Sequence, residues 1–142
     1  MVASLYCLVV GWKAMGPGAP LYFIPWAKPV SLTLMAVAVC LFIAANAPTD
    51  IKRYLRHPQL TRVVLWAIAH LLANGDMRSL ILFGGLGLWA LIEMPLINRG
   101  AGAWNKPAAF RATTTGVPNA IGLAVFAGLI FAHPWLSGGA LF

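Results

Sequence analysis

The segment RHPQLTRVVLWAIAHLLANGD, from Arg56 to Asp76, decides the fold of this chain. Most of its positions are apolar, and its proline lies in the first turn, where a helix tolerates proline best. Four residues recur at every fourth position: Arg62, Trp66, His70 and Asn74. Residues at this spacing share one face of a helix, and ionisable residues within a membrane almost always face the bundle interior or a wet cavity. The sequence therefore predicts a helix over 58–74 with this polar stripe turned inward.

The composition of the whole chain is typical of a membrane protein. Of its 142 residues, 61% are hydrophobic and 9% are charged, whereas soluble domains have about 25% charged residues. The net charge is +7, but there is no basic run with interleaved aromatic residues of the kind that binds nucleic acid. We therefore predict a single transmembrane domain over 1–142 that contacts the lipid bilayer, and we exclude a nucleic-acid partner.

Five apolar segments, separated by proline, glycine and charged residues, predict the architecture. They cover 1–15, 30–47, 58–74, 79–97 and 118–136. Each is expected to be helical, because strands would leave unpaired backbone groups in lipid. Pro118, like Pro58, is expected in the first turn of its helix. The predicted fold class is an all-α, polytopic membrane helical bundle of about five transmembrane helices.

The third and fourth segments are expected to form a tight antiparallel hairpin. Asn74-Gly75 is a turn signal between them, which centres the hairpin near Asp76. Counting along both helices brings Glu93 level with Gln59. Because charged groups at membrane depth usually find partners, we expect Glu93 to form an ion pair with Arg62 or His57.

Basic residues are distributed unequally between the two sides of the predicted bundle. One side carries the connections that contain Lys52, Arg53, Arg56, Arg62, Arg99, Lys106 and Arg111. The other side carries Lys28 and Arg78, with Lys13 at a helix end. Because cytoplasmic loops are enriched in lysine and arginine, we expect loops 48–62 and 98–117 to be cytoplasmic.

Two of the three histidines are expected at similar depths in the bundle. His70 and His133 lie twelve and fifteen residues from the same side, so their depths differ by ~5 Å, whereas His57 and His70 are ~20 Å apart. A planar cofactor between the two helices could take one axial ligand from each, since imidazole often ligates haem iron. Trp66 would then pack against the flat ligand, and Asn74 would orient an imidazole.

Each histidine also has a structural interpretation, which the sequence leaves open. His57 precedes a proline and could cap a helix or hydrogen-bond to Glu93. His70 could donate to a backbone carbonyl in a satisfied interior, and His133 could be an interfacial residue beside Trp135. Intramembrane polar groups often serve only to pair helices, and the chain has no CxxCH or HExxH motif.

The same residues resemble a known family. The segment of Arg56 to Asp76, followed by LFGGLGLWALIE and the closing HPWL, is similar to the NnrU family of bacterial membrane proteins over about residues 6–136. RHPQ, LWxxAH and AFRATTTGVPNAI are also similar to zeta-carotene isomerase. The NnrU resemblance implies a bacterial inner-membrane protein with a loosely defined association with denitrification and nitric oxide metabolism. The isomerase resemblance implies haem b held by histidines and redox-linked cis–trans isomerisation of a polyene.

Carried over to this chain, the resemblance implies that His57 and His70 are the histidines typical of the family, and that His133 corresponds to the closing HPW. Trp66 and Asn74 lie beside them. Family members usually begin with a further membrane helix that carries a histidine, and we expect this chain to start after that helix.

A more distant resemblance leads to a different cofactor. RHP, one glutamate on the next helix and FRATTTGVP look like isoprenylcysteine carboxyl methyltransferases, which bind S-adenosylmethionine on the cytoplasmic side. The matching positions are Arg56, His57, Pro58, Glu93, Phe110, Arg111 and Pro118. Leu60 replaces the tyrosine of that pattern, and Glu93 is single where an acidic pair is usual. We therefore interpret this resemblance as a shared fold rather than a shared reaction.

The third alternative is a non-enzymatic subunit of a larger membrane complex. The last segment has a stripe of small residues at a spacing of four: Ala120, Ala124, Gly128 and Ala132. Small residues at this spacing allow helices to approach closely. We expect this small-residue stripe to pack inside the chain's own bundle, although the same surface could contact a partner.

Overall fold

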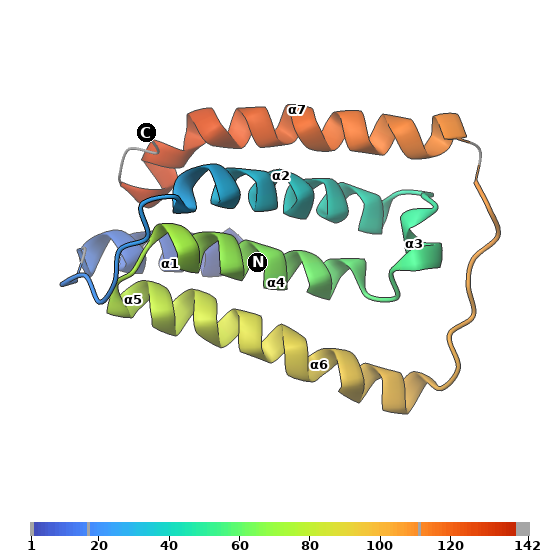
Figure 1. The fold of residues 1–142 in the computed structure, drawn as a ribbon, viewed down its shortest axis with the longest axis horizontal. Coiled ribbons are helices and arrows are strands. Elements are labelled where there is room, and N and C mark those ends of the chain that lie inside the picture. Colours follow the sequence, from blue (N-terminus) through green and yellow to red (C-terminus); the bar gives the residue numbers. More distant parts are fainter. Residues whose placement is uncertain (1, 17, 111, 139–142) are drawn as a thin grey trace.

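The computed structural model describes residues 2–16, 18–110 and 112–138, and these residues form a helical bundle (Figure 1). Its elements are α1 (Val2–Ala14), α2 (Ala27–Asn46), α3 (Ile51–Tyr54), α4 (Pro58–Ala73), α5 (Met77–Ser79), the π-helical turn η1 (Leu80–Gly84), α6 (Gly85–Ala101) and α7 (Ala112–Ser137). Figure 1 shows α7, α2, α4 and α6 side by side in that order, and α1 lies behind one end of this row. The predicted all-α membrane bundle is confirmed.

Three helical stretches are long and apolar enough to cross a membrane. They are Ala27–Asn46, Met77–Ala101 and Gly116–Ser137. Helices α1 and α4 have 13 and 16 residues, fewer than the ~20 that span a bilayer at right angles to its plane. The protein is therefore a membrane protein in which three helices reach full spanning length among the described residues, and the expected count of about five transmembrane helices is not confirmed.

The hairpin between the third and fourth segments is confirmed. Helix α4 ends at Ala73 and α5 begins at Met77, and α6 then packs back along α4 (Figure 1). Asp76 caps the returning helix, because its carboxylate accepts hydrogen bonds from Ser79 N at 3.0 Å and Ser79 Oγ at 2.8 Å. Such a cap satisfies a backbone N–H that has no partner within the helix.

Helix α7 begins earlier than the sequence predicted. It starts at Ala112, so Pro118 lies within the helix and the prediction that it occupies the first turn is wrong. A proline inside a helix removes one backbone hydrogen bond.

Two glycines allow the closest contacts between helices. A Cβ at Gly122 would lie 2.9 Å from Cys40 Cα, where α7 meets α2, and a Cβ at Gly87 would lie 2.9 Å from Ala67 Cβ, where α6 meets α4. The buried positions around them are mostly alanines, including Ala38, Ala44 and Ala90. Small residues permit this approach, and van der Waals packing drives helix association in lipid.

The small-residue stripe of α7 does not pack inside the bundle. Ala120, Ala124 and Gly128 are exposed and Ala132 is half-buried, whereas Gly122 is buried. The expectation that the stripe packs internally is therefore wrong. The four small residues share one face of α7, but the helix is rotated so that Gly122, two positions from Ala120 and Ala124, faces α2.

Replacing Gly122 with valine is expected to lower the free energy of unfolding by about 1–3 kcal/mol, the usual cost of overpacking. The added side chain would collide with the backbone of α2. Gly128→Val is the matched control, because a Cβ there meets nothing within 4 Å while the change in helix propensity is the same. Unfolding in detergent, followed by circular dichroism, measures the difference, and equal stability of the two variants would contradict the proposed contact.

Candidate ligand-binding site

The polar stripe of α4 faces the interior of the bundle, as predicted. All four of its members are half-buried: Arg62, Trp66, His70 and Asn74. Helix α4 is continuous through this stretch, from Pro58 to Ala73. The rings of Trp66 and His70 lie with their centroids 5.0 Å apart. The one-turn spacing of these residues therefore builds one side of a site.

Phe83 completes an aromatic cluster with Trp12, Trp66 and His70. Its ring stacks on His70 at 4.3 Å between centroids, and it meets Trp66 and Trp12 edge-on at 4.8 and 5.5 Å. Phe83 is 5% exposed and belongs to η1, a π-helical turn. Single π-turns are often found at functional sites. The sequence analysis did not assign Phe83 to the site, because the α-helical periodicity of the fourth apolar segment does not predict a π-turn.

The hydrogen bond of His70 fixes the tautomer of its ring. Nδ1 lies 2.9 Å from the carbonyl oxygen of Trp66. A carbonyl only accepts, so Nδ1 carries the proton in the neutral ring and Nε2 keeps a lone pair. The structural role expected for His70, donation to a carbonyl, is confirmed. The same bond leaves Nε2 as the ring's potential metal ligand.

His133 is oriented in a similar way. Ser137 Oγ lies 3.0 Å from the carbonyl oxygen of His133 and 3.2 Å from its Nδ1. The hydroxyl has one proton. When that proton is donated to the carbonyl, the hydroxyl accepts from Nδ1, and Nε2 of His133 also keeps its lone pair.

Both histidines line the same two cavities. The larger has a volume of about 800 Å³ and extends between α1, α4, η1 and α7, within the range of about 300–1,000 Å³ that is typical of ligand pockets. The smaller, of about 170 Å³, lies on the side of α2. His70, Asn74 and His133 border each of them. The depth count that placed His70 beside His133 is therefore consistent with the structure.

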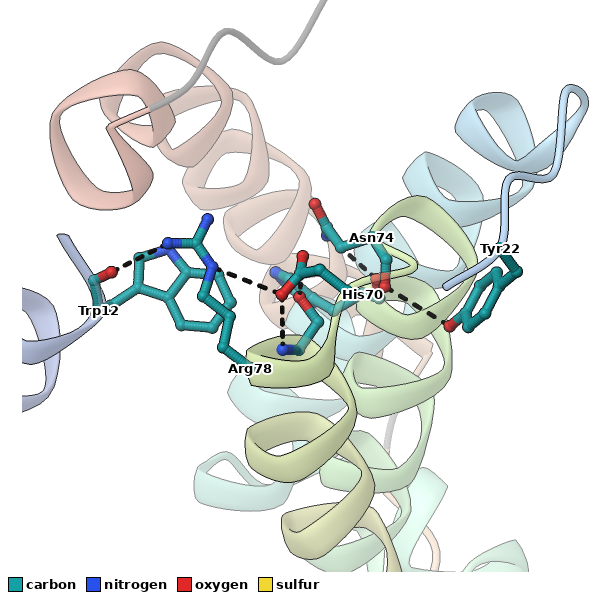
Figure 2. Close-up of polar contacts among 7 residues, drawn as sticks. Trp12, Tyr22, His70, Asn74 and Arg78 are labelled. Carbon is teal, nitrogen blue, oxygen red and sulfur yellow. Dashed lines mark hydrogen bonds and ion pairs between the residues drawn. The ribbon is translucent and has the colours of Figure 1, made fainter. Parts of the chain in front are cut away.

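Arg78 is one of the polar lining residues that the sequence analysis did not assign to the site. Its Nη1 donates to the carbonyl oxygen of Trp12 at 3.0 Å, and its guanidinium lies 4.2 Å from the centroid of the Trp12 ring (Figure 2). Its Nε lies 3.5 Å from Asp76 Oδ1. A basic residue two positions after a helix-capping aspartate was a visible signal, but nothing in the sequence placed Trp12 against it.

The expectation that Glu93 forms an ion pair with Arg62 or His57 is wrong. Arg62 Nε donates to Gln59 Oε1 at 2.5 Å, and its guanidinium lies 4.5 Å from the centroid of the Phe42 ring. His57 Nε2 is hydrogen-bonded to Asn98 Oδ1 at 2.8 Å. Glu93 makes no ion pair among residues 2–16, 18–110 and 112–138, because both expected partners are engaged elsewhere.

The residues of the methyltransferase resemblance lie at the other end of the bundle from Arg78. Arg56 Nη2 donates to Gly102 O at 2.7 Å, so both Arg56 and His57 are held against the C-terminal end of α6. Arg111 lies outside the described residues. Neither Arg56, His57 nor Glu93 borders the two cavities. Within the described parts of the chain, no three His, Cys, Asp or Glu side chains are grouped closely enough to hold a metal ion.

The fold and the site define the class of this protein, and comparison with known proteins identifies its family. The fold and the inward histidines define a helical membrane protein with a half-open, ligand-sized cavity between its helices. A family model described as NnrU protein matches residues 1–140, and the chain belongs to this family. No curated protein and no solved structure matches it.

Phe83→Ala is expected to lower the free energy of unfolding by up to about 3 kcal/mol, the lower end of the range for removing a core phenylalanine. The lower end applies because lipid chains weaken the hydrophobic term between helices. Phe131→Ala is the matched control, since Phe131 is 75% exposed on α7. Denaturant titration followed by tryptophan fluorescence reports on Trp12 and Trp66 directly. A loss at Phe131 as large as that at Phe83 would be inconsistent with the aromatic cluster.

Proposed function

We propose that this membrane protein binds haem b between α4 and α7, where His70 and His133 would hold the group. One observation carries the proposal: two histidines from different helices border one cavity of about 800 Å³, and each has its Nδ1 within hydrogen-bonding distance of a protein oxygen. Histidines that ligate metals almost always donate their other ring N–H in this way.

The residues around the histidines fit a flat, largely apolar group. Trp66 and Phe83 supply apolar faces and Leu129 and Leu136 line the α7 side. Asn74 donates from Nδ2 to the carbonyl oxygen of His70 at 3.0 Å, so it steadies the end of α4 rather than the imidazole itself. Asn74 was expected to orient an imidazole, and this expectation is wrong. The ring of His70 is bonded instead to the carbonyl oxygen of Trp66.

Bound haem would supply one-electron redox chemistry. The chain's own residues would hold the group, exclude water with the aromatic cluster and fix both imidazoles. With His70 and His133 holding the group, the chemistry that it would supply is electron transfer. This is compatible with a redox-linked, isomerase-like role toward a hydrophobic molecule such as a polyene, or with a role in nitrogen-oxide metabolism.

The two alternative functions have less support from the geometry. An S-adenosylmethionine site would use Arg56 and His57, whose side chains are already bonded to Gly102 and Asn98. A subunit role would use the exposed small-residue stripe of α7, which acyl chains could equally cover. His57 therefore serves as a control in the test of haem binding.

Purified protein reconstituted with haem b is expected to show the Soret and visible bands of iron with two histidine ligands. His70→Ala and His133→Ala should each abolish this spectrum, because one ligand is lost. His57→Ala should leave it unchanged, and Ser137→Ala should weaken haem binding about 10–100-fold, the usual effect of removing a ligand's hydrogen-bond partner.

Two results would overturn the proposal. One is the absence of a haem spectrum after reconstitution of folded protein. The other is an unchanged spectrum in His70→Ala. Loss of S-adenosylmethionine binding in His57→Ala, measured by calorimetry, would instead favour the methyltransferase alternative.

We also propose that the protein lies in a bacterial inner membrane with loops 48–62 and 98–117 in the cytoplasm. Figure 1 places α3 and the connection after α6 at the same end of the bundle, which supports a common side for their basic residues. Single cysteines at Lys52 and Lys106 are expected to be protected from a membrane-impermeant thiol reagent in intact cells, and one at Ala19 is expected to react. Labelling at Lys52 or Lys106 but not at Ala19 would reverse the orientation.

A further inference from the structure

The larger cavity has cationic side chains at one end and no acidic residue among the side chains that line it. Lys13, in the last turn of α1, and Arg78, at the start of the α5–α6 helix, are its charged lining residues. The cavity is otherwise mostly apolar or aromatic, with His70, Asn74 and His133 as its main polar groups. An apolar pocket that is positively charged at one end suits an amphipathic anion.

The guanidinium of Arg78 is fixed in place but incompletely bonded. The side chain is 16% exposed, and the ring and carbonyl of Trp12 hold it from one side. Figure 2 shows its second terminal nitrogen directed away from Trp12, with no dashed contact to the other residues drawn. Its buried Nε has no hydrogen-bond partner among the described residues. Arginine has five N–H donors, so this group retains the capacity to bind an anion.

Asp76 does not complete the bonding of Arg78. One carboxylate oxygen accepts from Ser79 N and the other from Ser79 Oγ. The separation of 3.5 Å between Arg78 Nε and Asp76 Oδ1 is longer than a hydrogen bond to a charged group, which is about 2.7–2.9 Å. The carboxylate is committed to the helix cap, and it lowers the local charge without occupying the donors of Arg78.

Lys13, the residue after Trp12, lines the same cavity and lies near the end of α7. Its Cγ lies 3.7 Å from the position that a Cβ on Gly138 would take, just beyond the end of α7. Its long side chain can therefore lie along apolar surface while the ammonium group stays near the opening. The two cations come from helices far apart in the sequence, and only the folded bundle brings them to one cavity.

We propose that Arg78, assisted by Lys13, binds the carboxylate of an amphipathic ligand whose apolar body fills the larger cavity. The inference rests on the proposed function in one respect: a porphyrin carrying propionate groups is the ligand that satisfies both the histidines and the two cations. Arginine presents paired N–H donors that match a carboxylate. A hydrocarbon polyene has no such group, so it would occupy other space.

The experiment compares protoporphyrin IX with its dimethyl ester, which has the same ring but no free carboxylate. Neither compound contains iron, so binding does not require histidine ligation. Wild-type protein in detergent is titrated with each, and quenching of the protein's intrinsic tryptophan fluorescence reports binding. We expect the free acid to bind about tenfold or more tightly than the ester, since hydrogen bonds to charged groups contribute roughly that much.

Variants assign the preference to Arg78. Arg78→Leu is expected to bind the acid no better than the ester, and Arg78→Lys should keep part of the preference because it keeps the charge. Arg99→Leu, which removes one exposed positive charge on α6, should behave like wild type. The comparison of acid and ester in the wild-type protein tests the inference even when Arg78→Leu fails to fold.

Equal affinity for acid and ester, failure to bind either compound, or a preference that survives in Arg78→Leu would overturn the inference. The same titration with haem b separates it from the proposed function. A preference for the free acid without a bis-histidine haem spectrum would refute only the proposed ligation. A bis-histidine spectrum with equal affinity for haem and its dimethyl ester would refute only the role of Arg78.

Discussion

The hydrogen bond from His70 Nδ1 to the carbonyl of Trp66, beneath the stacked ring of Phe83, is the interaction on which the rest of the site depends. Lipid offers no water to a polar side chain, so an intramembrane histidine must find its partners within the protein. This bond satisfies Nδ1 within α4 itself and leaves Nε2 with its lone pair. The inward position of α4, between α2 and α6, follows from the same requirement.

The short connection at Asp76 joins the cap, the hairpin and the charged end of the cavity. The Asp76 carboxylate caps the returning helix by accepting a hydrogen bond from Ser79 N. Leu21 N donates to Gly75 O at 2.6 Å, and this bond holds the α1–α2 connection against the turn. Tyr22 Oη adds a bond to Leu71 O at 2.5 Å. A side chain at Gly75 would collide with the Tyr22 carbonyl, which explains why glycine suits this position. The turn therefore fixes Arg78 relative to α1 and to the end of α4.

The site combines features that are unfavourable in isolation. A half-buried guanidinium is costly in an apolar environment, and Trp12 offsets part of that cost through its ring and its carbonyl. Helix α4, too short to cross a bilayer unaided, is surrounded by longer helices that shield its polar face. The bundle thus keeps a polar interior within an apolar exterior, which is the arrangement that a membrane-embedded ligand site requires.

The sequence by itself determined the membrane class, the helical fold, the hairpin at Asp76 and the inward stripe, because composition and a spacing of four residues encode burial along one helix. It also predicted the similar depths of His70 and His133 by counting residues. Its predictions of the partner of Glu93, of the start of α7 and of the orientation of the small-residue stripe were wrong. It also did not assign Phe83 and Arg78 to the site. Those features depend on which helices are neighbours and how each is rotated about its axis. Only tertiary packing decides this, since periodicity identifies a face of one helix but not the side chains that it meets.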